Sequence, residues 1–196
     1  MKRQVFAAAM IAGAQLMAST AFAAECPVDV TDPFDLEEDA VIALYECMKD
    51  SMVEGYSKKE DEVATAYREW TVSSTRPAVA GAHGNRFLQT WANDIAAEQY
   101  LKFEEEGVEM PVGSVLAKES FKIHKKKKKA VIGPLFIMTK LEEGTSPDTN
   151  DWFYSGVQPN GKPMKLKQSF CSDCHIGWID QDALAYPLEE VRVSQD

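Results

Sequence analysis

The stretch SVLAKESFKI at residues 114–123 decides the fold class, because it is the longest of the runs that read as β-strands. Its apolar residues fall on alternate positions, as they do in a strand with one face against a core. Two further strand-like runs follow at residues 135–141 and 152–158, joined by a polar loop at 142–150. The PNG sequence at residues 159–161 is a strong turn signal. This part of the chain therefore predicts an antiparallel sheet, the economical arrangement for short connections.

Helical patterns precede this sheet. Apolar residues recur at helical spacing over residues 36–54, and Gly55 is expected to end that helix. A second amphipathic helix is expected at residues 59–70. A strand-like run at 86–91 then gives way to a helix for which Asn93 offers a cap oxygen. The sequence predicts an α+β fold, a largely antiparallel β-sheet with packed helices.

The first residues read as an export signal. Lys2 and Arg3 precede an apolar run, and AFA at residues 21–23 is typical of a cleavage site, so residues 1–23 are expected to be a secretory signal peptide. The apolar run is shorter than the roughly 20 residues of a spanning helix. The mature protein is therefore expected in the periplasm, with no membrane span.

The charge of the chain bears on its partners. Its formal net charge is −10, which argues against nucleic acid and favours a basic redox partner protein. The lysine run at residues 125–129 lies between two strand candidates and is expected to be a solvated loop.

The four cysteines form two different pairs. In an oxidising compartment, Cys26 and Cys47 are expected to form a disulfide that pins the N-terminal segment to the first helix. Two buried free thiols are the alternative. Cys171 and Cys174 belong instead to the sequence CSDCH at residues 171–175.

The C-x-x-C-H pattern is the attachment signature of a c-type haem. Two thiols at this spacing can bond to the two haem vinyl groups while the adjacent imidazole reaches the iron. A structural zinc site would need a second close pair of ligands, and a thioredoxin-like dithiol would follow a strand early in a βαβ unit. We therefore expect one covalently attached haem c, held by Cys171 and Cys174, with His175 as an iron ligand.

The ligand in the other axial position of the iron distinguishes a reactive haem site from an electron carrier. His83 and His124 are the two further histidines of the chain. His124 adjoins the lysine run and is expected in solvent, and His83, within GAHG at residues 81–84, is expected to be a loop or structural histidine. If His83 or a methionine bound the iron, a simple electron-transfer cytochrome would become the leading interpretation.

Several motifs occur in an order that resembles the cytochrome P-460 family. They are YREW at 67–70, HGNRF at 83–87, PVGSVLAKESF at 111–121, GPLFIM at 133–138, DW at 151–152 and FC at 170–171. The resemblance divides the mature chain into a helical extension at residues 24–58, which lies outside it, and a haem domain at 59–196. It implies an antiparallel sheet with helices around it, a homodimer, and a five-coordinate haem c with an open distal face.

The resemblance implies two functions. One is oxidation of hydroxylamine to nitric oxide or nitrous oxide, and the other is binding of nitric oxide or carbon monoxide, as in the related cytochrome c′-beta. In the gas-binding case, apolar side chains such as Phe121 and Phe136 would wall the distal side, although both could equally be plain core.

Three further residues are candidates for the site. In hydroxylamine-oxidising members, a lysine at the motif position of Lys118 is bonded to a meso carbon of the porphyrin; without the resemblance, a solvent-facing strand lysine would look the same. Arg86 is a candidate cation for the pocket or a partner in a surface or dimer-interface salt bridge. The resemblance places Gln168 near a pocket carboxylate that efficient hydroxylamine-oxidising members use as a proton relay. An amide cannot take up a proton, so weak turnover is expected, and Gln168→Glu should raise it.

Overall fold

The sheet of this protein has seven strands, all paired antiparallel, in a computed structural model that describes residues 25–194. The expected signal peptide lies outside the described residues. The α-helices and strands are α1 (Glu38–Ser57), α2 (Glu62–Ala66), β1 (Thr71–Val72), β2 (Ala78–Ala80), β3 (Arg86–Ala92), α3 (Asp94–Tyr100), β4 (Val115–His124), β5 (Lys129–Ile132), β6 (Leu135–Lys140), β7 (Trp152–Val157) and α4 (Gln168–His175). The predicted α+β fold with a largely antiparallel sheet is confirmed.

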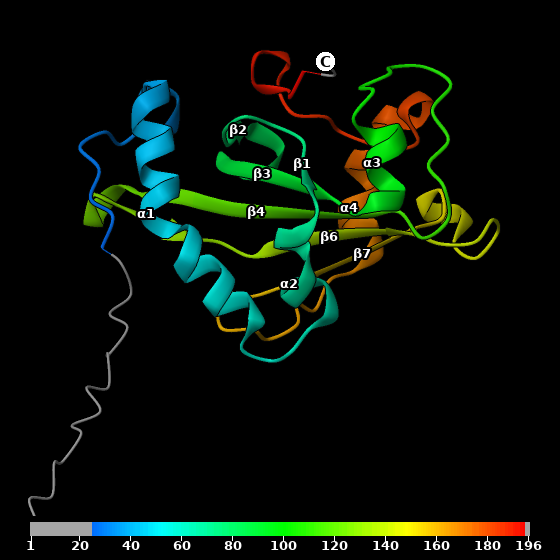
Figure 1. The fold of residues 1–196 in the computed structure, drawn as a ribbon, viewed down its shortest axis with the longest axis horizontal. Coiled ribbons are helices and arrows are strands. Elements are labelled where there is room, and N and C mark those ends of the chain that lie inside the picture. Colours follow the sequence, from blue (N-terminus) through cyan, green and yellow to red (C-terminus); the bar gives the residue numbers. More distant parts are fainter. Residues whose placement is uncertain (1–24, 195–196) are drawn as a thin grey trace, which may run out of the picture.

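Strand β4 organises the sheet. The order is β1-β3-β4-β6-β7, with β2 alongside β3 and β5 alongside β4. Strand β4 therefore pairs with three neighbours, and it lies at the centre of the arrangement in Figure 1, with α1 toward one end of the strands and α3 and α4 toward the other. The predicted strands at 114–123, 135–141 and 152–158 agree with β4, β6 and β7 to within one residue at each end. The lysine run forms the tip of the β4–β5 hairpin, as expected.

The two predicted N-terminal helices have different ends from those expected. Helix α1 continues through Gly55, which was expected to end it, because the missing side chain lets the helix pack directly against the Pro159 backbone. The Tyr56 hydroxyl then donates to the Gly133 carbonyl oxygen at 2.8 Å. Helix α2 is shorter than the predicted 59–70, because Asp61 caps it by accepting from the Ala64 N–H and a 3₁₀ turn at Tyr67–Glu69 follows it.

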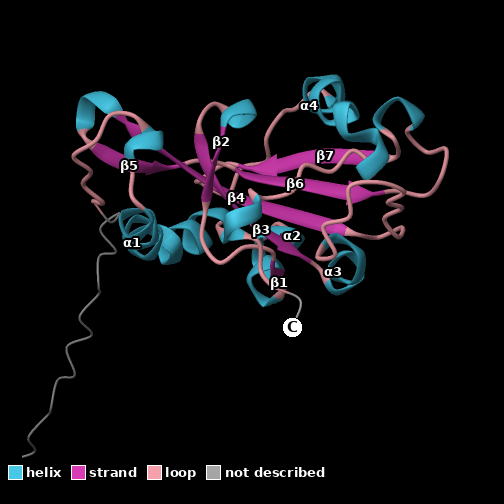
Figure 2. Cartoon of the chain, turned by 90° about the horizontal axis from the view of Figure 1, so that it is seen from above, coloured by secondary structure: helices cyan, strands magenta, loops and turns pink. Residues whose placement is uncertain are grey.

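The two faces of β4 are buried against different parts of the chain. Odd-numbered residues, with Ala117 and Phe121 among them, pack in a core to which α1 contributes Leu44, Met48 and Met52. Leu116, on the even-numbered face, belongs to a second core. In Figure 2, α4 lies beyond β7 at the top of the view and α1 lies below β5. Lys122 is the one exposed residue of β4, so the strand is buried on both faces, although its even-numbered face also carries the polar Lys118 and Ser120.

A buried carboxylate joins α1 and the 3₁₀ turn at Tyr67–Glu69 to β4. Glu119 is 1% exposed, and its two oxygens accept hydrogen bonds from Tyr45, at 2.6 Å, and from Tyr67 and Arg68, at 2.6 and 2.7 Å. The Arg68 guanidinium also packs over the rings of Tyr45 and Trp91. A buried charge is tolerated when it is paired and hydrogen-bonded in this way.

The expected disulfide between Cys26 and Cys47 is present, with a Cα–Cα distance of 6.1 Å. The segment before α1 pairs with β5, since the Ala130 N–H donates to the Cys26 carbonyl and the Val28 N–H to the Lys128 carbonyl. The disulfide therefore links this edge segment to α1. None of the helices between residues 25 and 194 has the length and apolarity to cross a bilayer.

Candidate haem-binding site

The C-x-x-C-H motif lies on helix α4, which sequence patterns did not predict. Cys171, Cys174 and His175 stand three and four residues apart, so a helix brings them to one face, and all three line a single cavity. Both thiols are free. Burial, and secondarily the neighbouring Cys174, raises the pKa of the Cys171 thiol.

His175 is held in the orientation that a metal-binding histidine needs. It is 7% exposed, and its Nδ1 lies 2.8 Å from the Ala183 carbonyl oxygen. A carbonyl can only accept, so Nδ1 carries the hydrogen and Nε2 is left with a lone pair. Burial, with a smaller contribution from Lys118, lowers the pKa of His175 to about 4, so the ring is neutral at pH 7.

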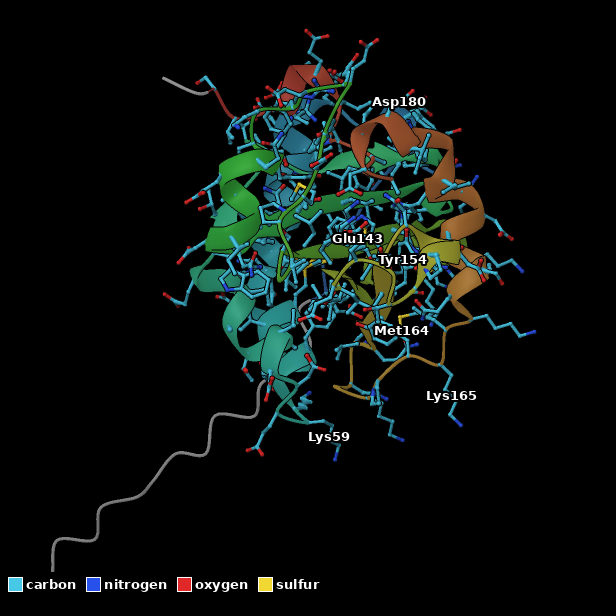
Figure 3. All side chains as sticks on the ribbon, turned by 90° about the vertical axis from the view of Figure 1, so that its right-hand side faces the viewer. Lys59, Glu143, Tyr154, Met164, Lys165 and Asp180 are labelled. Atoms are coloured by element: carbon cyan, nitrogen blue, oxygen red, sulfur yellow. A yellow bond between two sulfur atoms is a disulfide. The ribbon has the colours of Figure 1, made fainter. Side chains whose placement is uncertain are left out.

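The cavity has a volume of about 750 Å³, within the roughly 300–1,000 Å³ of pockets that hold small molecules and cofactors. The sheet provides its floor, α4 and the segment after β7 one wall, and β2 with the turn that follows it another. In Figure 3, Tyr154 lies inward of the orange α4 segment, whereas the exposed Lys165 extends to the outside. The floor residues that point into the cavity from four adjacent strands include Thr90, Lys118, Phe136, Met138 and Tyr154.

Lys118 is on this floor and not on a solvent-facing strand surface. It is 4% exposed, and its ammonium has no hydrogen-bond acceptor or carboxylate partner within residues 25–194. Burial lowers its pKa to about 8. The alternative of an ordinary solvated lysine is therefore wrong.

Arg86 and His83 also line the cavity. Arg86 is half-buried and has no ion-pair partner among the described residues; burial lowers the pKa of its guanidinium. His83 belongs to the 3₁₀ turn η3 (Gly81–His83), and its ring packs edge-on against Phe136 with centroids 5.1 Å apart. Burial, then the charge of Lys118, lowers the pKa of His83 to about 4. Its place in a loop is as expected, but its position beside the C-x-x-C-H motif was not foreseen.

Gln168 lies away from where the sequence suggested, and the structure separates the two alternatives that the sequence left open for Phe121 and Phe136. Gln168 is not among the residues that line the cavity: its Oε1 accepts from the Tyr154 N–H and its Nε2 donates to the Tyr154 carbonyl, both at 2.8 Å. Its amide therefore fastens the start of α4 to β7 and is not placed to relay protons. Phe121 is core, stacked on Phe87 with ring centroids 4.7 Å apart, whereas Phe136 does line the cavity.

The donor set of the cavity fits a haem. A haem brings four nitrogen ligands to its iron, so the protein need supply only axial ligands and attachment thiols. The buried hydroxyls of Tyr154 and Tyr186 line the cavity without hydrogen-bond partners, and Lys118 and Arg86 face it with no carboxylate in the lining of the described residues. These free donors and cations suit a cofactor that carries carboxylates.

The same residues do not suit zinc. Cys26 and Cys47 are bonded to each other in the disulfide and cannot serve as thiolate ligands. Between residues 25 and 194, no group of three or more histidine, cysteine or acidic side chains is arranged to hold a metal ion.

Comparison with known proteins agrees with this geometry. A search of curated proteins finds no match to the chain. A family model described as Cytochrome P460 matches residues 64–185, from α2 to the segment beyond the C-x-x-C-H motif. The matched region is more than half of the chain and includes His83, Lys118 and His175. The chain belongs to the cytochrome P460 family.

Proposed function

We propose that this protein carries one covalently attached haem c and oxidises hydroxylamine to nitric oxide or nitrous oxide. The observation that carries the proposal is Lys118, a buried and unpaired lysine on the floor of the cavity that Cys171, Cys174 and His175 also line. Family membership supports a haem cofactor. The proposal includes export to the periplasm by residues 1–23, a homodimer, and a partner protein that accepts the electrons.

The chain's own residues would bind and orient the cofactor. The Cys171 and Cys174 thiols would add across its vinyl groups, and His175 would bind iron through Nε2 while the Ala183 carbonyl holds Nδ1–H. When bound, the haem supplies the iron at which hydroxylamine is oxidised. Nitric oxide formation releases three electrons and three protons per hydroxylamine, so a proton acceptor and an electron acceptor are both required.

The proposal has the Lys118 side-chain nitrogen bond to the porphyrin edge. An amine must be neutral to attack a carbon, and a pKa of about 8 leaves roughly a tenth of the side chains neutral at pH 7, against well under a thousandth at an ordinary lysine pKa. The new nitrogen–carbon bond replaces one N–H and one C–H bond. Two electrons and two protons must therefore leave, and an oxidant such as hydrogen peroxide would take them during maturation.

Turnover is expected to be slow. The part of the cavity that the structure describes has no carboxylate in its lining, and Gln168 is bound to the Tyr154 backbone. Protons from the substrate would have to pass to His83 or to water at the cavity mouth. Neither route provides a fixed carboxylate next to the substrate.

The test uses holoprotein matured in a host with haem c attachment. A pyridine haemochrome spectrum should show haem c, and proteolysis with mass spectrometry should yield a haem peptide that joins the Cys171–His175 segment to a peptide containing Lys118. Hydroxylamine should be consumed when an oxidising dye is present. Lys118→Ala should abolish both the covalent link between residue 118 and the haem and the turnover of hydroxylamine. Lys122→Ala is the matched control, because Lys122 is exposed on the same strand four residues away.

Two results would overturn the proposal. Absence of haem c removes its basis entirely. A Lys118 peptide free of haem, together with no consumption of hydroxylamine, would leave binding of nitric oxide or carbon monoxide, as in cytochrome c′-beta, as the function.

A further inference from the structure

We propose that His83 is the second axial ligand of the haem iron in the resting protein, so that an external ligand has to displace its imidazole. The inference rests on the proposed attachment of haem to Cys171 and Cys174, but not on hydroxylamine turnover. It replaces the expected open distal face with one that a histidine of the η3 turn closes reversibly.

The spacing of the two histidines carries the inference. The rings of His83 and His175 have centroids 6.4 Å apart, and both rings line the cavity. Two imidazoles on opposite sides of one iron would have centroids roughly 6 Å apart, because a metal–imidazole bond is about 2 Å long and each ring adds its own radius. The angle of 88° between the ring planes agrees with this, since each ring can rotate about its own bond to iron.

The two ring nitrogens of His83 are available to bind a ligand. Neither ring nitrogen has a hydrogen-bond partner within residues 25–194, although the ring is half-buried. His124 differs, since its Nδ1 accepts from the Lys127 N–H at the tip of the β4–β5 hairpin. A partly buried imidazole that faces a cavity without partners is suited to bind a group in that cavity.

The turn that carries His83 can release the ring at low cost. Gly81, Ala82 and Gly84 are all exposed, and Gly84 ends the turn with a φ of 71°, a conformation that favours glycine. None of the residues 81–84 belongs to either core. His83 can therefore leave the iron while the sheet and α4 stay in place.

Lys118 and two methionines, Met138 and Met164, are the rival ligands in the cavity. The experiment must separate them from His83. Ferric holoprotein should give a low-spin electron paramagnetic resonance spectrum of the bis-histidine type. His83→Phe should convert it to high spin, while Lys118→Leu and the control His124→Phe should leave it low-spin.

Cyanide provides a second measurement. If His83 occupies the iron in about nine of ten molecules, His83→Phe should bind cyanide with an apparent affinity about tenfold higher than wild type. His83→Gly guards against a purely structural effect: added imidazole should restore its low-spin spectrum, which a packing role for His83 does not predict.

A high-spin wild-type spectrum that His83→Phe leaves unchanged would overturn the inference, as would a low-spin spectrum that persists in His83→Phe. Hydroxylamine consumption is recorded on the same samples. A high-spin wild type that consumes hydroxylamine refutes only the role of His83, whereas a low-spin wild type that consumes none refutes only the proposed enzyme activity.

Discussion

Lys118 and Lys140 are two lysines of the sheet with little exposure, but their surroundings differ. Lys140 Nζ lies 2.6 Å from Asp182 Oδ1 and also donates to the Asn150 carbonyl. Lys118 has no such partner among the described residues, and its pKa is lowered to about 8 by burial. An unpaired buried ammonium destabilises the folded chain, so Lys118 lowers the stability of the haem-free protein.

This gives a prediction for the pH dependence of stability. Below pH 8, Lys118 is protonated in both the folded and the unfolded chain, and the penalty of burying its charge is complete. Between pH 8 and the unfolded pKa of 10.5, the unfolded chain binds more protons, so this contribution to stability rises with pH. Lys118→Met should therefore stabilise haem-free protein by on the order of 3 kcal/mol at pH 7 and by much less near pH 10.

Urea unfolding of wild type, Lys118→Met and the exposed control Lys122→Met, at both pH values, measures this difference. A stabilisation by Lys118→Met that is the same at the two pH values would show that the ammonium is not the cause.

At the scale of elements, the longer strands follow from the sequence, and the shorter elements do not. Strands β4, β6 and β7 have apolar patterns bounded by turn residues, and the cap of α3 at Asn93 is visible in the sequence. Strands β1, β2 and β5 have two to four residues each, too few to show a period. Helix α4 was missed because QSFCSDCH has eight residues, about two turns, which is too few to show a helical period against the loops around it. Tertiary contacts hold this helix, and the hydrogen bonds of Gln168 to Tyr154 are among them.

The residues of the candidate site likewise differ in whether the sequence alone predicts them. Cys171, Cys174 and His175 could be found from spacing alone, because the porphyrin dictates that spacing. His83 could not, since a histidine in a glycine-flanked turn has no periodicity, and only the folded chain brings η3 to face α4.

Gln168 provides a test at this scale. Gln168→Glu removes the Nε2 donor to the Tyr154 carbonyl and places a carboxylate oxygen beside that carbonyl. We now expect a loss of about 1–2 kcal/mol of stability and no gain in turnover, the reverse of the expectation from sequence. Gln158→Glu is the control, because the Gln158 side chain makes no hydrogen bond within residues 25–194. Faster hydroxylamine turnover in Gln168→Glu at unchanged stability in urea would restore the proton-relay role.

At the scale of the whole molecule, the N-terminal extension is part of the packed fold although the family match begins at residue 64. Helix α1 shares a core with β4, and Tyr45 donates to Glu119. The disulfide closes a loop with a sequence separation of 21 residues between the β5 edge and α1. The extension therefore supports the strand from which Lys118 projects.

Loss of the disulfide should destabilise the protein by about 3 kcal/mol, because the unfolded chain gains loop entropy. Cys26→Ser, Cys47→Ser and the double variant should all show the same loss in urea unfolding, since each breaks one and the same bond. Losses that add in the double variant would instead mean that each side chain contributes by its own packing.

Lys118 and Glu119 are neighbours on β4, yet one reaches the cavity and the other the tyrosines and arginine beneath α1. Adjacent side chains of a strand point to opposite faces, so a slip of one residue would exchange them. The carboxylate would then enter the cavity without its three donors, and the ammonium would meet Arg68. Strand β4 thus has one alignment that its charges permit, and a single residue inserted ahead of Lys118 would exchange the faces to which Lys118 and Glu119 point rather than merely lengthen the strand.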